Sequence, residues 1–225
     1  RQQQANLLML EGAAPADIDR VLTDFGFPMG PFQMSDLAGL DIGWNAETSK
    51  GETVRDRLCE AGLSVSAWNR SRTKSDHLLP FGARVTDTPA EAVAQADVVI
   101  TLLEDGGIVE DVLFRQGAAQ AMRPGSIVMD MSSIQPAQAR DHAARLGALG
   151  VHHIDAPVSG GTLGAEQGTL AIMAGGKAAD VERVQPVLAV LGRATHVGPH
   201  GAGQLAKLAN QMIVGITIGA VAEAL

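Results

Sequence analysis

The sequence is poor in aromatic residues and has no cluster of positive charge. Its 225 residues include five Phe, two Trp and no Tyr, and 17 Lys and Arg stand against 25 Asp and Glu, for a formal charge of −8. Proteins that bind nucleic acid usually carry a basic surface, and many add aromatic side chains that stack on bases. We therefore expect no nucleic-acid partner.

Cysteine is almost absent as well, because Cys59 is the only one and no internal disulfide can form. No uninterrupted apolar run reaches the roughly 18 residues that a membrane span needs, and the first residues do not form a signal peptide. These absences favour the cytoplasm and no membrane partner. Because the chain begins without Met and ends at Leu225 inside an apolar helical pattern, we expect a piece of something longer.

Residues 1–62 have helical periodicity. Ile18, Val21, Leu22 and Phe25 recur at the spacing i, i+3, i+4, i+7, which places them on one face of a helix. No alternation of apolar and polar residues interrupts this pattern. An all-helical segment is predicted for residues 1–62.

From Leu63 the pattern changes to strands that alternate with helices. Leu63, Val65 and Ala67 alternate with serines and predict the first strand. Further strands are expected over 97–103, 126–132, 152–157 and 169–175, and helices over 89–96, 107–122, 136–149 and 180–191. This order predicts an α/β fold over 63–198, a doubly wound, mostly parallel sheet of the Rossmann type. A helical pattern from Gly201 predicts that residues 199–225 begin a helical domain.

Asp155–Gly161 follows a predicted strand, at the place where open α/β folds bind ligands. Gly160 and Gly161 would let a substrate carboxylate approach backbone N–H groups, and the Ser159 hydroxyl can donate another hydrogen bond. A plain turn from strand to loop explains the same residues equally well.

Lys207 lies on the predicted helix that begins after Gly201. Helical spacing places it one turn before Gln211, with Asn210 adjacent. An ammonium group beside a carboxamide can polarise a hydroxyl or carbonyl and transfer a proton. The alternative is a solvated surface lysine. The glycine-rich segment before Lys207 and the apolar residues around it disfavour this alternative.

Together these stretches resemble the β-hydroxyacid dehydrogenase family over most of Leu63–Leu225. The motifs follow in family order: Trp68–Ser71, Ala96–Leu103, Pro124–Ser133, Asp155–Gly161, Gly168–Met173 and His196–Pro199, leading to Lys207 and Asn210-Gln211. The resemblance implies NAD(P)-dependent oxidoreduction of a small 3-hydroxy acid or its semialdehyde.

The resemblance also implies roles for single residues. Lys207 would be the acid/base catalyst. Substrate binding would fall to Ser159, Gly160, Gly161, Asn210 and Gln211. Leu102, Leu103 and Ser133 match positions that line the nicotinamide cofactor, although Glu104 stands where members often have proline. No metal-binding residues are predicted.

Asn69, Arg70 and Ser71 follow the strand whose end meets the adenosine ribose in a dinucleotide fold. An acidic residue there favours NAD, whereas an arginine accommodates the 2′-phosphate of NADP. With a guanidinium group and no carboxylate, NADP is expected in preference to NAD. For Arg70 an ordinary surface charge is the alternative.

The glycine-rich loop of a dinucleotide site is missing. Such a fold begins with a strand, the motif G-x-G-x-x-G and a helix, because glycine lets the backbone approach the pyrophosphate. Gly39, Gly43 and Gly51 precede Leu63, but they do not match this spacing and follow helical pattern. We expect the fold to lack both its first strand and its phosphate-binding loop.

Residues 7–62 instead resemble the C-terminal helical domain of 3-hydroxyacyl-CoA dehydrogenases. The resemblance rests on Gly12–Arg20, Gly26–Phe32, Asp36–Trp44 and Arg55–Gly62. It implies a role in dimerisation and in an acyl-CoA cleft, so a homo-oligomer is expected where the helical domain is complete. Gly26–Phe32 could equally be a structural turn.

These two resemblances predict a chimera joined near Ala61-Gly62, whose own activity is open. The alternatives are a 3-hydroxyacyl-CoA dehydrogenase fragment, which would need a catalytic His/Glu pair, and a non-catalytic remnant or interaction subunit.

Overall fold

The computed structural model describes residues 54–224. Glu52–Leu208 forms one compact unit, and the residues from Ala209 onward belong to another. Helix α13 (Ala202–Glu223) runs through this boundary. The helices expected over residues 1–53 lie outside the described residues, and helix α4 (Val54–Glu60) is the first described element.

The unit Glu52–Leu208 contains short strands and helices in alternation. Its strands are β1 (Ser66–Ala67), β2 (Arg84–Val85), β3 (Val98–Thr101), β4 (Ile127–Asp130), β5 (His152–Asp155), β6 (Val158–Ser159), β7 (Leu170–Gly176) and β8 (Gly192–Gly198). Its further helices are α5 (Thr73–Asp76), η1 (Leu79–Phe81), α6 (Pro89–Val93), α7 (Gly106–Glu110), the π-helical η2 (Asp111–Arg115), α8 (Ala118–Ala121), α9 (Pro136–Ala148), α10 (Gly161–Gln167), α11 (Ala178–Arg183) and α12 (Gln185–Leu191).

The main sheet has six strands in the order β3-β4-β5-β7-β6, with β8 paired to β7. Strands β3, β4 and β5 are parallel, as expected. Strand β7 runs antiparallel to β5 and β6 and parallel to β8, so most strand pairs among the described residues are parallel and the mostly parallel prediction is confirmed. Strand direction depends on tertiary pairing, which periodicity does not encode.

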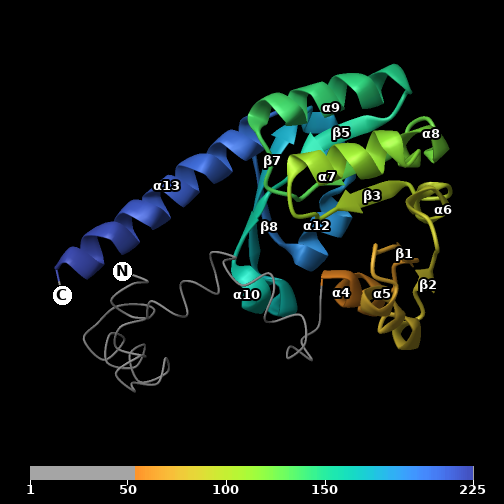
Figure 1. The fold of residues 1–225 in the computed structure, drawn as a ribbon, viewed down its shortest axis with the longest axis horizontal. Coiled ribbons are helices and arrows are strands. Elements are labelled where there is room, and N and C mark those ends of the chain that lie inside the picture. Colours follow the sequence, from red (N-terminus) through yellow and green to blue (C-terminus); the bar gives the residue numbers. More distant parts are fainter. Residues whose placement is uncertain (1–53, 225) are drawn as a thin grey trace. The chain divides into compact units, whose positions relative to one another are not determined.

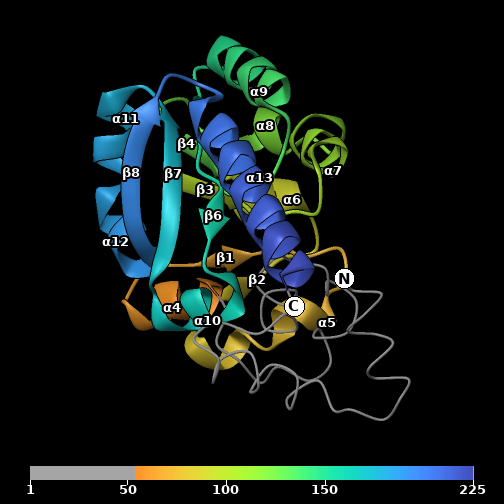
Figure 2. The ribbon, with the colours of Figure 1, turned by 90° about the vertical axis from the view of Figure 1, so that its left-hand side faces the viewer.

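Helices cover both faces of this sheet, so the prediction of an α/β, doubly wound architecture is confirmed (Figures 1 and 2). On one face α11 and α12 pack their buried residues Val181, Leu188 and Leu191 against Met129 and Ile154. On the other face Val128 packs with residues of α7, η2, α8 and α9, among them Val109 and Leu146. Alternate residues of one strand therefore supply two separate cores.

The sheet is interrupted where the first strand of a Rossmann fold belongs. In that fold the strand order is 3-2-1-4-5-6. Here β2 and β1 form a separate two-stranded parallel sheet, and the main sheet begins at β3 (Figure 1). Within residues 54–224 no strand pairs with the second side of β1 or of β3. Among the described residues the sheet is thus divided between β1 and β3, and the prediction of a Rossmann-type fold is confirmed. The predicted lack of a first strand concerns residues outside the described range.

Helix α4 packs on the α/β unit. The Arg57 guanidinium donates hydrogen bonds to the carbonyl oxygens of Val190 (3.2 Å) and Glu166 (2.8 Å). Leu58 is buried in the same core as α11 and α12. Residues 54–60 therefore belong structurally with the sheet that follows them.

Helix α13 is 22 residues long, with a mean hydropathy of 1.5 over an 18-residue stretch, and by length and composition alone it could cross a membrane. This finding contradicts the expectation that no segment reaches such a length. The expectation counted uninterrupted apolar runs, whereas α13 reaches this average although it contains Lys207, Asn210 and Gln211.

Candidate functional site

The parallel strands β3, β4 and β5 end side by side. Thr101 pairs with Asp130 across β3 and β4, and Asp130 pairs with Asp155 across β4 and β5. The residues that follow these three positions in the chain therefore leave the sheet at one edge, where ligands bind in open α/β folds.

Asp130 organises the loops at this edge. Its Oδ1 accepts a hydrogen bond from the Thr101 hydroxyl (2.8 Å) and another from the Ser132 backbone N–H (3.0 Å). Burial raises the pKa of the Asp130 carboxyl above 3.8 despite these hydrogen bonds. The second oxygen, Oδ2, is buried and has no partner among the described residues.

Gln204 on α13 holds the loop after β4 from both sides of Ser133. Its Oε1 accepts from the Ile134 N–H (3.0 Å), and its Nε2 donates to the Ser132 carbonyl (2.8 Å). Ser132 also accepts from the Leu103 N–H through its hydroxyl (2.9 Å). The predicted cofactor positions Leu103 and Ser133 are thereby fixed to one network, while Leu102 and the Ser133 side chain are exposed.

Asp155 fixes the start of α13. Its two carboxylate oxygens accept from the backbone N–H groups of Gly201 (2.8 Å) and Gln204 (3.0 Å). Gly203 allows this contact, because a Cβ there would overlap the carbonyl oxygens of Asp155 and Met173. The helix therefore meets the sheet backbone to backbone, one turn before Lys207.

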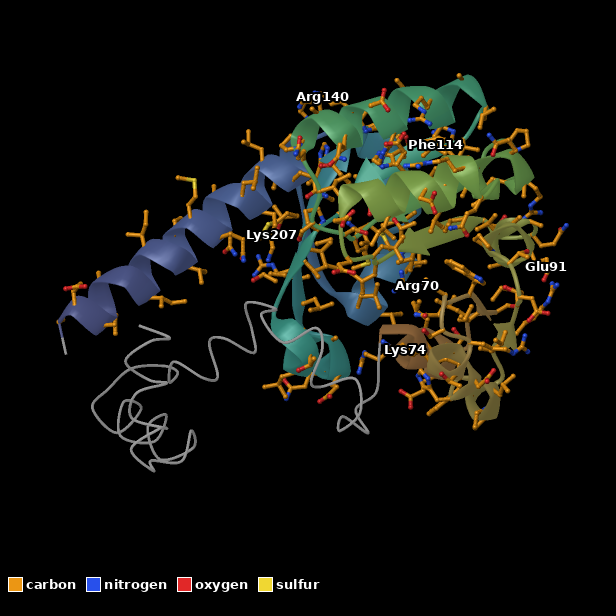
Figure 3. The ribbon with its side chains drawn as sticks, viewed as in Figure 1. Arg70, Lys74, Glu91, Phe114, Arg140 and Lys207 are labelled. Atoms are coloured by element: carbon orange, nitrogen blue, oxygen red, sulfur yellow. The ribbon has the colours of Figure 1, made fainter. Side chains whose placement is uncertain are left out.

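Lys207 is half-buried on α13 (Figure 3). Burial lowers the pKa of its ammonium group below 10.5, because the charged form is partly desolvated. Lysines with a lowered pKa carry out acid/base chemistry more readily than solvated ones. Lys207 thus differs from the solvated surface lysine that was the alternative.

Asn210 and Gln211 follow on the same helix, in the unit that begins at Ala209. Both are partly buried, and the Asn210 Nδ2 donates to the Gln211 Oε1 (3.1 Å). The two carboxamides therefore hold each other in place.

Ser159, Gly160 and Gly161 form the turn from β6 to α10. Gly160 has φ 135° and Gly161 has φ 60°, conformations that residues with a Cβ rarely adopt. A Cβ at Gly160 would also press on the Leu170 side chain. This backbone needs glycine for its own shape, and the Ser159 side chain stays partly accessible.

Asn69, Arg70 and Ser71 follow the end of β1. The Asn69 Oδ1 accepts from the Ser71 N–H (2.9 Å), which closes the turn. Arg70 is exposed, and its side chain extends from this turn (Figure 3). A turn fixed by its asparagine thus presents one guanidinium group.

The histidines of β5 do not form the His/Glu pair that a 3-hydroxyacyl-CoA dehydrogenase would need. The His152 Nδ1 lies 2.8 Å from the Asp180 Oδ1. His153 is buried in the sheet. Among the described residues neither histidine is paired with a glutamate.

Thr101, Asp130, Ser132 and Gln204 were not predicted as site residues. For Asp130 a signal existed, since it ends a buried strand and precedes two serines. Gln204 gave none, because its partners lie 70 and 72 residues earlier in the chain.

Comparisons with known families match two parts of the chain. Residues 48–199 match the NAD binding domain of 6-phosphogluconate dehydrogenase. Residues 1–78 match the C-terminal domain of 3-hydroxyacyl-CoA dehydrogenase. Both predicted resemblances are thus present, and their ranges overlap in the stretch that contains α4.

Individual relatives agree with the first match. A probable 3-hydroxyisobutyrate dehydrogenase-like protein of Arabidopsis thaliana is 37% identical over 186 residues, which cover 82% of this chain and 56% of the relative. The 2-hydroxy-3-oxopropionate reductase of Escherichia coli K12 is 43% identical over 153 residues, 67% of this chain and 52% of the reductase.

A solved structure shares the fold. The 3-hydroxyisobutyrate dehydrogenase of Mycobacterium tuberculosis, determined with L-serine, aligns with a TM-score of 0.73 and 37% identity over 76% of this chain and 58% of its own. The chain thus spans little more than half the length of these relatives. With the α/β fold and the motif order, these matches show that the chain belongs to the β-hydroxyacid dehydrogenase family, whose NAD-binding domain it carries at residues 48–199.

Proposed function

We propose that this chain is an NAD(P)-dependent oxidoreductase for a small 3-hydroxy acid or the corresponding semialdehyde. The observation that carries the proposal is Lys207, a desolvated lysine on a helix that Asp155 and Gly203 fix to the carboxyl end of β5. Family membership supports the same chemistry, because the relatives above are named as dehydrogenases and reductases.

In the oxidation direction, the neutral Lys207 amine takes the proton of the substrate hydroxyl as the carbinol carbon becomes a carbonyl. A nicotinamide held beside that carbon would supply the acceptor for its hydride. In reduction Lys207 returns the proton to the carbonyl oxygen. The lowered pKa favours the neutral amine in the first direction.

We assign substrate binding to Ser159, Gly160 and Gly161 through the carboxylate, with Asn210 and Gln211 orienting the rest of the molecule. Ser159 is partly accessible and can donate its hydroxyl proton to an anion.

We assign the two ends of the cofactor to two groups of residues. Leu102, Leu103 and Ser133 would line the nicotinamide end, and Asn69, Arg70 and Ser71 the adenosine end, where Arg70 favours NADP over NAD. The sequence before α4 contains no G-x-G-x-x-G motif whose backbone N–H groups would hold the pyrophosphate. Cofactor affinity is therefore expected to be weak.

The test is an assay of the purified chain with a panel of small 3-hydroxy acids and semialdehydes at saturating NADPH, NADH and their oxidised forms. Lys207→Ala should lower kcat by roughly 100-fold or more, as expected for loss of a general acid/base. Lys177→Ala, which changes an exposed lysine next to α11, is the matched control. Turnover that is equal in both variants would contradict the role of Lys207.

A further inference from the structure

A second group of side chains joins strand β5 to the segment that leads into α13. His153, Asp155 and His200 each offer one ligand atom, and these three atoms lie within 4.8 Å of one another. His153 and Asp155 are two residues apart on β5 and so face the same side of the sheet. His200 directly precedes Gly201, whose N–H binds Asp155.

Three buried ring nitrogens of the two imidazoles have no hydrogen-bond partner among the described residues. His153 is 2% exposed, and neither of its ring nitrogens has a partner among the described residues. The buried Nδ1 of His200 also has none, and the two rings lie 5.8 Å apart between centroids. A buried polar atom without a partner destabilises the folded state, so an additional atom between the rings would be favourable.

The Asp155 carboxylate can bind a cation in addition to its present hydrogen bonds. Both oxygens of Asp155 already accept one N–H each, and a carboxylate has roughly four lone-pair sites, so each oxygen can still bind a metal. Asp130 lies in register beside Asp155, so a second carboxyl group stands next to the three side chains.

We propose that His153, Asp155 and His200 form a divalent-metal site, with Zn²⁺ as its best-fitting occupant, which links strand β5 to the segment that leads into α13. Two histidines and one carboxylate are a known zinc-binding set that leaves a fourth position for water. Tetrahedral zinc needs ligand atoms roughly 3.3 Å apart, so the three side chains must move together from the separations in the metal-free geometry. Its proposed role is to tie β5 to the start of α13, because Asp155 already accepts hydrogen bonds from the Gly201 and Gln204 N–H groups.

The experiment is a metal titration of the full chain without an affinity tag, after removal of metals with a chelator. Zn²⁺ binding is followed by calorimetry, and Co²⁺ serves as a spectroscopic probe of a four-coordinate site. One metal ion per chain is expected, with a rise in Tm on binding. Failure to bind one equivalent of either metal overturns the proposal and leaves a buried water as the atom between the rings.

Variants identify the ligands. His153→Phe keeps a ring in the core and should weaken Zn²⁺ binding at least 100-fold; His200→Ala should do the same at a half-buried position where misfolding is less of a risk. His142→Ala is the control, since this buried histidine on α9 also has an unpartnered Nδ1 but is not part of the group. Binding that persists in His200→Ala, or is lost in His142→Ala, contradicts the assignment. Because no cofactor or substrate is present, the result is independent of the proposed oxidoreductase activity.

Discussion

The two ends of the candidate site are built in different ways. At the carboxyl ends of β3, β4 and β5, buried hydrogen bonds from Asp130, Gln204 and Asp155 connect each loop to the next and to α13. At the adenosine end, β1 and β2 form a two-stranded sheet apart from the main one. Among the described residues, side-chain hydrogen bonds thus hold the strand ends of β3, β4 and β5 together, whereas β1 and β2 have no further strand beside them.

The difference between the two ends predicts that adding a first strand and a glycine-rich loop has the largest effect on cofactor binding. Replacing residues 1–53 by a strand and a G-x-G-x-x-G loop joined to α4 should tighten NADPH binding about 1000-fold, or about 4 kcal/mol, because backbone N–H groups then hold the pyrophosphate. Fluorescence titration measures this change. A graft with valine at the first two motif glycines is the control, and equal affinities for both grafts would refute the view that the loop is the limiting part.

Replacing Gln204 should destabilise the loops at the carboxyl ends of β3, β4 and β5. Gln204→Leu leaves the Ile134 N–H and the Ser132 carbonyl buried without partners, which should lower the free energy of unfolding by about 3 kcal/mol. Urea unfolding of the chain gives this value. The same change at exposed Gln167 should have little effect, and similar losses in both variants would argue against a special role for the Gln204 network.

Arg70, at the adenosine end, should determine the preference between NADPH and NADH. In the grafted chain, Arg70→Glu should shift the ratio of the NADPH and NADH dissociation constants roughly 30-fold toward NADH, since a carboxylate repels the 2′-phosphate. Arg193→Glu makes the same charge change at an exposed position on β8. An unchanged ratio in Arg70→Glu would mean that the arginine is an ordinary surface charge.

The smallest effect is expected at Asp130. Because its pKa in the folded chain is raised above 3.8, its stabilising contribution is complete below pH 3.8 and is lost as the pH rises through the raised pKa. Asp130→Asn removes this titration, so its Tm relative to the parent should increase as the pH rises above 3.8. Thermal melts across that range measure the trend, and exposed Asp97→Asn is the comparison. A relative Tm that falls over the same range would show that the ionised carboxylate is stabilising.

Much of the fold could be predicted because the buried strands are short apolar runs. Val98–Thr101 and Ile127–Asp130 are of this kind, and Pro136 marks the start of α9. Strand β8 was missed because Gly192–Gly198 is polar and largely exposed, and β2 and β6 have only two residues each.

The site was predictable where a residue's role depends on its own segment. Lys207 could be placed on a helix one turn before Gln211 from spacing alone. Gln204 and the histidine group could not be found in this way. Strands β7 and β8 lie between His153 and His200 in the sequence, although the two rings are close in space. Contacts between distant segments depend on packing, which no local pattern records.

The divided sheet has a consequence for solubility. Within the described residues, β1 and β3 each keep one side on which backbone N–H and C=O groups have no neighbouring strand. Unprotected edges of this kind recruit strands from other chains, and proteins ordinarily cover, charge or twist them to prevent fibre-like association. We therefore expect these two edges, where no other segment covers them, to be the places at which copies of the chain would associate.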